Sequence, residues 1–388
     1  MGKFTETPVS LNTGVPIINI PVFELSQGGI NLPVSLNYHS SGIKVEEEGS
    51  WIGLGWDLTV GGRISRTVRC RPDDDHASGF IKTGNQIPSE YLIDLDLSTY
   101  GRIGSALNFL SGVMRNIKDY EADAFYFSDP SGSGSFMFNN HGIPTTIPFS
   151  DVNIVPLYKQ GEISGFILTH SNGLVYYFGD TLSRANNQFI EITNASNGPF
   201  GSIHNYISSW MLNRIVNPLT AEVISFTYKS SNSFSNSKSE TQVWQQDCSY
   251  CPNFSLINTD YHTTLIRTST KFLEKISLEN FSVNFCTSGR QDDEGLKLDS
   301  IRYLNKTFIF NYDYFKSNTN SSSMNELRLK LNKFSTKDHY KNEINNYEFL
   351  YNPTQLPKKD SKSQDHWGYY NNQNNSTLIP TTTSANLQ

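Results

Sequence analysis

The sequence predicts an all-β protein, mainly antiparallel and built of hairpins, with little helix. Aromatic residues make up 13% of the 388 positions, including 24 Phe and 20 Tyr, while charged residues make up only 18%. Apolar and polar residues alternate in many short runs, which is the period of a strand with one buried face. Gly, Pro and Asn-Gly pairs separate those runs, as they do in hairpin turns.

The chain begins with a predicted hairpin. Pro16 and Pro21 exclude a helix at this point and suit strand ends or edge strands. Residues 32–39 alternate apolar and polar side chains, and Gly28-Gly29 supplies the turn before them.

A segment rich in Trp and Gly follows at residues 51–66, which we call the Trp/Gly segment. It holds two Trp, four Gly and two Arg. Gly permits tight bends and close backbone approach, and Trp carries a large apolar body with one donor. We therefore predict a structural segment that locks β-structure together. Its predicted structural residues are Trp51, Gly53, Gly55, Trp56, Gly61, Gly62, Arg63 and Arg66.

The middle of the chain is less regular before it returns to strands. Residues 88–118 are the best candidate for a helix. The clearest hairpin lies at 165–179, where two apolar runs flank Ser171-Asn172-Gly173.

A degenerate, YD-like hairpin repeat is predicted in the C-terminal half. Each copy has Leu-x-x-Ile or Leu-x-x-Phe, a turn, and then a strand with alternating large side chains. One hairpin cannot bury such a face alone, but hairpins stacked in one curved sheet can. The copies are 212–215 with 224–228, 273–276 with 281–285, 298–301 with 308–312, and 331–334 with 347–351.

These patterns divide the chain into four predicted parts. Residues 1–124 form an N-terminal β module that contains the Trp/Gly segment, and 125–204 form a β-hairpin module. Residues 205–370 form the stacked hairpins, with a loop insertion at 229–262, and 371–388 form a flexible tail.

Charge and hydropathy exclude several classes of partner. The net charge is −6 without a basic stripe, so we expect no nucleic-acid partner. No stretch approaches the roughly 20 apolar residues of a membrane span. The N-terminus lacks the apolar core of a signal peptide.

Cys248 and Cys251 have C-x-x-C spacing. A zinc site needs a second pair of ligands, and Cys286 and His262 are the nearest candidates, at an unfamiliar spacing. The alternatives that stay open are unpaired thiols, a local disulfide, a cross-link to Cys286 or Cys70, and a metal site.

Two further clusters have a chemical and a structural interpretation. The run 73–76, Asp-Asp-Asp-His, carries oxygen ligands for a hard cation, but its spacing favours a solvated acidic loop. The sequence Asp365-His366-Trp367 contains an acid–base pair, and its position favours a structural strand end. No nucleophile, phosphate-binding or metalloprotease motif occurs, so we predict no enzyme activity and no cofactor.

Residues 13–72 resemble the N-terminal region of the large secreted Rhs/YD-repeat proteins of Bacteroidota. The matching text includes Leu-Pro-Val-Ser-Leu-Asn-Tyr-His at 32–39 and Trp-Ile-Gly-Leu-Gly-Trp at 51–56. A shorter form of this pattern occurs in the SpvB/TcB-type regions of insecticidal toxin complexes. Residues 365–371 and 378–380 are also similar to the family, where they precede the YD-repeat shell.

The resemblance implies a non-catalytic cap, plug or shell part of a secreted, toxin-like protein. The partners it implies are a downstream YD-repeat shell and a C-terminal effector of the same polypeptide. It also implies export as cargo of the type IX translocon, and hence a secreted or cell-surface location. The repeats and the effector would follow beyond this chain, so no toxic activity is carried over. The alternative is a cell-surface adhesion or glycan-binding module, in which exposed Tyr and Trp side chains stack on sugars.

Overall fold

The structure is a computed structural model that is nearly all β, with antiparallel pairing throughout, as the sequence predicts. It describes residues 15–69, 71–83, 119–180, 187–198, 201–246, 254–318, 320 and 322–379. Helix within these residues is confined to α1 (Phe80–Thr83) and the 3-10 turn η2 (Met324–Glu326). No helix in this part of the chain is long and apolar enough to cross a membrane. The predicted helix at 88–118 lies outside the described residues.

A small sheet forms from the start of the chain, in the order β1 (Ile17–Gln27), β2 (Ile30–His39) and β3 (Trp56–Thr59). The predicted turn joins β1 and β2, with Gly28 and Gly29 at φ 54° and 81°. Positive φ at both positions suits glycine and matches the twist of the flanking strands.

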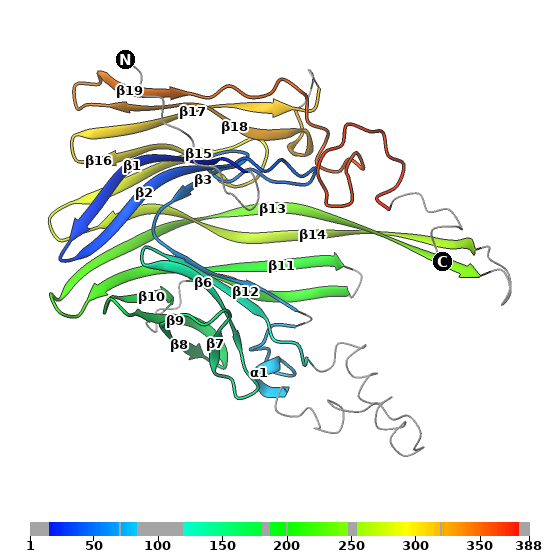
Figure 1. Cartoon of the computed structure of the whole chain (residues 1–388), viewed down its shortest axis with the longest axis horizontal. Helices are drawn as coiled ribbons and strands as arrows, with labels where there is room; N and C mark the ends of the chain where they lie inside the picture. Colours follow the sequence, from blue (N-terminus) through cyan, green and yellow to red (C-terminus); the bar gives the residue numbers. More distant parts are fainter. Residues whose placement is uncertain are drawn as a thin grey trace.

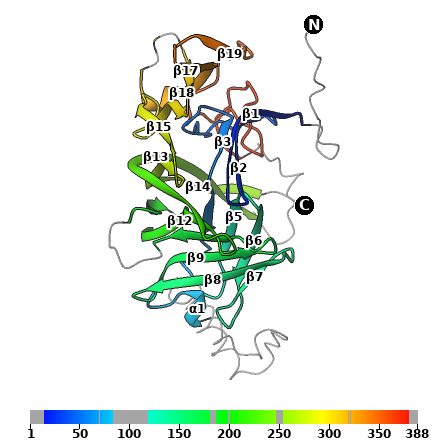
Figure 2. The same cartoon turned by 90° about the vertical axis from the view of Figure 1, so that its left-hand side faces the viewer.

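The remaining strands form one large sheet around β12 (Gly201–Asn217). Two arms leave this strand and curl toward each other (Figure 2). One arm is β10 (Val175–Gly179), β9 (Glu162–His170) and β8 (Val152–Lys159). The other is β4 (Arg63–Thr67), β5 (Ala124–Asp129), β6 (Gly132–Phe138) and β7 (Pro144–Thr146).

Aromatic side chains fill the space between the arms. Phe166 of one arm packs edge-on against Phe125 and Phe136 of the other, with ring centroids 5.9 and 5.5 Å apart. Trp210 of β12 lies 5.0 Å from Phe166, and its indole N–H donates to the carbonyl of Ile163. The period-2 alternation of these strands therefore places their rings in one core.

Beyond β12 the sheet continues through β11 (Ile190–Gly198) and β13 (Glu222–Gln246), and then through a series of hairpins that we call the meander. The meander runs through β14 (Phe254–Ser277), β15 (Ser282–Gly289), β16 (Leu296–Tyr303), β17 (Lys306–Lys316), β18 (Leu327–Lys337) and β19 (Glu343–Glu348). Its strands pair in chain order, and β19 forms one end of the sheet (Figure 1).

Each of the four predicted hairpins is present. The last residue of each Leu-x-x-Ile or Leu-x-x-Phe motif faces a large side chain of the following strand. The facing pairs are Ile215 with Ile224, Ile276 with Val283, Ile301 with Phe308, and Phe334 with Tyr347. The likeness of these hairpins to YD repeats stays a prediction.

The expectation of a loop insertion was wrong. The stretch 229–262 is not a loop in its described residues, because β13 and β14 pair continuously from Lys229 to Gln246 and form a long ribbon (Figure 1). Of the predicted tail at 371–388, residues 380–388 lie outside the described residues, and residues 371–379 contact the rest of the fold. The backbone N–H of Leu378 donates to Glu240 on the ribbon at 2.8 Å.

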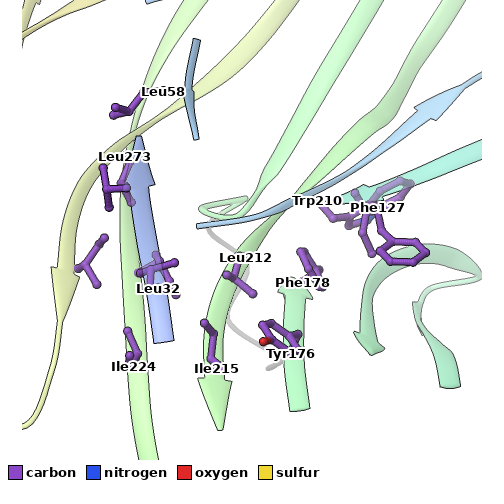
Figure 3. Packing of buried hydrophobic residues seen from close by; sticks show 14 of the residues in the cluster. Leu32, Leu58, Phe127, Tyr176, Phe178, Trp210, Leu212, Ile215, Ile224 and Leu273 are labelled. Carbon is purple, nitrogen blue, oxygen red and sulfur yellow. The ribbon is translucent and has the colours of Figure 1, made fainter. Parts of the chain in front are cut away.

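The small sheet covers one face of the meander (Figure 2). Phe23 of β1 stacks on Tyr303 of β16, with ring centroids 4.7 Å apart. Leu32 of β2 belongs to the same buried cluster as Ile224 and Leu273 (Figure 3). The chain between β2 and β4 must therefore cross the meander, and that crossing is made by the Trp/Gly segment.

Candidate functional site

The Trp/Gly segment joins its backbone to the meander and to β12. The carbonyl of Gly62 accepts from the Leu212 N–H at 2.9 Å, and that of Trp51 accepts from the Leu298 N–H at 3.0 Å. The Leu54 N–H donates to a carbonyl of β18 at 2.8 Å. Leu212 opens the first predicted hairpin copy and Leu298 opens the third, so the segment contacts these two hairpins at corresponding positions.

Trp51 packs on the second hairpin copy. Its half-buried ring lies 6.2 Å from Phe272 and 6.3 Å from Phe285, measured between centroids. Trp51 thereby links β14 and β15 through side-chain contact, while its carbonyl is bound to β16.

Trp56 packs on the last hairpin copy. It is only 4% exposed, and its ring lies 4.5 Å from Phe349 and 5.0 Å from Tyr38. Its indole N–H donates to the hydroxyl of Tyr351 at 2.8 Å. That hydroxyl in turn donates to the carbonyl of Leu331 at 2.6 Å. Both tryptophans therefore face the chain's own core.

The tyrosine bond just described recurs along the sheet. In three hairpin copies, a tyrosine at the end of the alternating row donates to the carbonyl of the leucine that opens the copy. The pairs are Tyr228 with Leu212, Tyr312 with Leu298, and Tyr351 with Leu331. Sequence reasoning missed this bond, although the tyrosine at the third position of three rows was its visible sign.

The glycines of the segment permit these close approaches. Gly53 has φ +122°, and a Cβ there would lie 3.1 Å from the carbonyl oxygen of Leu329. A Cβ on Gly62 would lie 2.7 Å from a β5 carbonyl oxygen. Gly55 lies against the Tyr38 ring and Gly61 against the Phe226 ring. Arg63 is different, because its side chain is exposed on β4.

Arg66 is buried in a charged network. Its guanidinium donates to Asp74 at 2.6 Å and to the carbonyl of Ile207 at 2.5 Å, and lies 3.8 Å from Asp123. Asp73 and Asp123 are tied reciprocally, since each carboxylate accepts the other's backbone N–H. The prediction of a solvated acidic loop was therefore wrong for Asp73 and Asp74, which are buried.

Burial sets the protonation of these carboxyls. Loss of hydration raises the pKa of Asp73 to about 8 and that of Asp123 to about 7, and the nearby Arg66 opposes both shifts. One oxygen of Asp73 has no hydrogen-bond partner among the described residues.

A second buried network anchors the residues before Trp51. Arg290 makes a two-point ion pair with Asp292, and its remaining donor reaches the carbonyls of Gly49 and Ser50 at 3.1 and 2.8 Å. Arg328 of β18 donates to the carbonyl of Val45 at 2.5 Å. The loop at 45–50 is thereby fixed to the meander through charged hydrogen bonds.

A His–Asp pair that sequence reasoning missed connects two turns. The Nε2 atom of His170 lies 2.8 Å from an oxygen of Asp129, and both groups are buried. The hydroxyl of Ser131 is bonded to Tyr176 at 2.6 Å and to Asn172 at 2.9 Å. The polar groups of this cluster bond to one another, and these bonds connect the β5–β6 turn to the β9–β10 turn.

Asp365 closes a tight turn. One oxygen of its carboxylate accepts from the N–H groups of Trp367 and Tyr369, each at 2.9 Å. Gly368 completes the turn at φ +88°, while the His366 and Trp367 side chains are exposed. The Asp365 carboxylate therefore accepts hydrogen bonds from backbone N–H groups of its own turn, and no bond joins it to the His366 imidazole among the described residues.

The cysteine prediction stays open. Cys70, Cys248 and Cys251 lie outside the described residues. Cys286 on β15 is a free, half-buried thiol, and His262 lies on the ribbon opposite Ser239. Within the part of the chain that the structure describes, no cluster of metal-ligating side chains could hold a metal ion.

A groove of about 660 Å³ lies beside Trp56, and we call it the Tyr351 groove. Three segments distant in the sequence line it, at 38–43, 351–356 and 369–372, together with Phe315. The third segment follows directly on the turn closed by Asp365. That turn is fixed to the first segment's neighbour, because the Val45 N–H donates to the carbonyl of Gly368 at 2.9 Å.

Together these features define an all-β protein whose successive hairpins are joined by one crossing segment. Comparisons of the chain with models of known protein families and with curated proteins found no match.

Proposed function

We propose that this chain is the non-catalytic, N-terminal structural part of a secreted Rhs/YD-repeat protein of the toxin-like kind. In this role it caps or plugs the shell that downstream repeats form around a C-terminal effector. The protein travels as cargo of the type IX translocon and acts outside the cell or at its surface.

The observation that carries this proposal is the meander. Its hairpins add to the sheet in chain order and end at β19, whose six residues are all exposed. Among the described residues β19 pairs only with β18, so its outer edge presents unpaired backbone groups. Such an edge is a template for another strand. A further hairpin of a downstream repeat would continue the sheet at this point.

The proposal is tested by protease protection of the effector. The natural polypeptide that carries this chain is compared with a version that lacks residues 1–388. We expect the effector to be cleaved faster when these residues are missing, and equal protection would exclude the capping role.

An edge variant makes the test specific. Ile344 of β19 is 57% exposed, and Ile344→Lys places a charge that disfavours pairing at this edge. We expect this variant to lower the protection. The matched control is Leu219→Lys, which changes an exposed residue in the β12–β13 turn and should leave protection unchanged.

A second candidate function is a cell-surface adhesion or glycan-binding module. The Tyr351 groove favours it, because aromatic rings and amide side chains line the same hollow.

A further inference from the structure

We propose that the Tyr351 groove binds a neutral oligosaccharide. This inference rests on the second candidate function and gives it a site and a class of ligand. The groove volume of about 660 Å³ falls within the range of about 300–1,000 Å³ that small-molecule sites occupy.

His39 is the only histidine among the described residues that line the groove. None of the described residues that line it is Lys, Arg, Asp or Glu. Two cations lie over lining rings without lining the groove themselves: Lys44 over Tyr369 at 5.8 Å, and Lys330 over Phe315 and Tyr351 at 5.4 and 5.5 Å from the centroids. A phosphate or carboxylate in the groove would therefore lack the bidentate partner that such groups normally require. The ligand that fits is neutral.

The rings of the groove are fixed before any ligand arrives. Tyr351 is held by the indole N–H of Trp56 on one side and by its own bond to β18 on the other. Phe315 meets its ring edge-to-face at a centroid distance of 5.1 Å. Tyr369 packs against Gly42, where a Cβ would lie 3.2 Å from the ring. Fixed rings lose little entropy when a flat, C–H-rich sugar face stacks on them.

Amide donors remain available beside the rings. The side-chain oxygen of Asn352 accepts from the Thr354 N–H at 2.9 Å, and that of Asn372 accepts from the Tyr370 hydroxyl at 2.8 Å. Their amide nitrogens make no hydrogen bond to another described residue. An amide oriented in this way presents two donors, which suit the hydroxyl oxygens of a sugar.

The wall formed by residues 38–43 and 369–372 does not suit an extended peptide. Peptides that add to a sheet need a free strand edge. Next to this wall, the backbone of Lys44 already bridges to Tyr369, and Val45 is bonded to Gly368. This wall therefore offers a ligand side chains rather than backbone groups, and side chains of these types can contact the ring faces and hydroxyls of a sugar.

The test is titration calorimetry on the chain of residues 1–388. The probes are cellohexaose, laminarihexaose, maltohexaose and chitohexaose, with polygalacturonate and an unstructured neutral peptide as contrasts. The variants are Tyr370→Ala, which removes a ring of the groove, and Asn372→Ala, which removes an amide and the acceptor of the Tyr370 hydroxyl but no ring. The control is Tyr340→Ala, an exposed tyrosine outside the groove.

We expect at least one neutral hexasaccharide to bind. Tyr370→Ala should weaken its binding about tenfold, or about 1.4 kcal/mol, while Tyr340→Ala leaves it unchanged. Should Tyr370→Ala fail to fold, a loss of binding in Asn372→Ala carries the same meaning. The proposal is overturned if no neutral hexasaccharide binds, if only polygalacturonate or the peptide binds, or if both groove variants bind like the native chain. None of these results bears on the capping role, which is measured by protease protection without any sugar.

Discussion

Replacing Trp56 by alanine tests whether the Trp/Gly segment contributes to the stability of the fold. A tryptophan side chain buries about 150–250 Å², which at about 25 cal/mol per Å² corresponds to about 4–6 kcal/mol. Partial burial in the unfolded chain lowers this figure, and measured losses for buried Trp→Ala changes are about 3–5 kcal/mol. Because Trp56 is 4% exposed and bonded to Tyr351, we expect a loss of about 4 kcal/mol.

Urea unfolding followed by circular dichroism measures this loss without depending on tryptophan fluorescence. Trp56→Phe keeps most of the ring contacts but loses the indole hydrogen bond, so we expect a smaller loss of about 1–2 kcal/mol. The matched control is Trp367→Ala, because Trp367 is 71% exposed, and it should change stability by less than about 0.5 kcal/mol. If Trp56→Ala unfolds at the same urea concentration as Trp367→Ala, burial of Trp56 does not stabilise the fold.

Three more predictions concern the residues around this segment. Gly53→Ala places a side chain at a positive φ and against β18, so it should lower the unfolding free energy by about 1–3 kcal/mol. The control is Gly289→Ala, where a Cβ meets open space, and this change should lower the unfolding free energy far less. Arg66→Met leaves buried carboxylates unpaired and should cost about 3–5 kcal/mol in urea unfolding, whereas Arg69→Met at an exposed ion pair should stay within about 0.5 kcal/mol. Burial raises the pKa of Asp73 to about 8, so the stabilisation from its bound proton is complete below its unfolded pKa of about 4 and is lost as the pH rises through about 8. The melting temperature should therefore fall as the pH rises from about 4 to about 8 and level off above that, and a decrease of the same size in Asp73→Asn would exclude this explanation.

The hairpins could be predicted from the sequence because their pattern is local. Alternation within a strand fixes which side chains share a face, and a Leu-x-x-Ile motif next to an aromatic row indicates two strands with matching faces. The pairing of Ile301 with Phe308 is one example.

The β13–β14 ribbon could not be predicted in the same way. Its residues 229–246 are rich in Ser, Gln and Asn, so neither face of the strand carries an apolar row. Pairing of the two backbones stabilises the ribbon instead, and composition alone does not reveal such pairing.

The buried charges and the groove depend on contacts between distant residues. Asp73 and Asp74 resemble a solvated acidic run until Arg66 and Asp123 are brought against them by the pairing of β4 with β5. The Tyr351 groove likewise needs segments more than three hundred positions apart in the sequence, at 38–43 and 369–372, to lie side by side. Only the fold supplies that proximity.

The bond from Trp56 to Tyr351 also determines when the molecule can complete its fold. The two residues are 295 positions apart, so during synthesis at about 5–20 residues per second Trp56 waits about 15–60 s for its partner to appear. Contacts of such long range are made late in folding. Trp56 is therefore synthesised well before its partner, and a ribosome-bound chain that ends before residue 351 cannot form this contact.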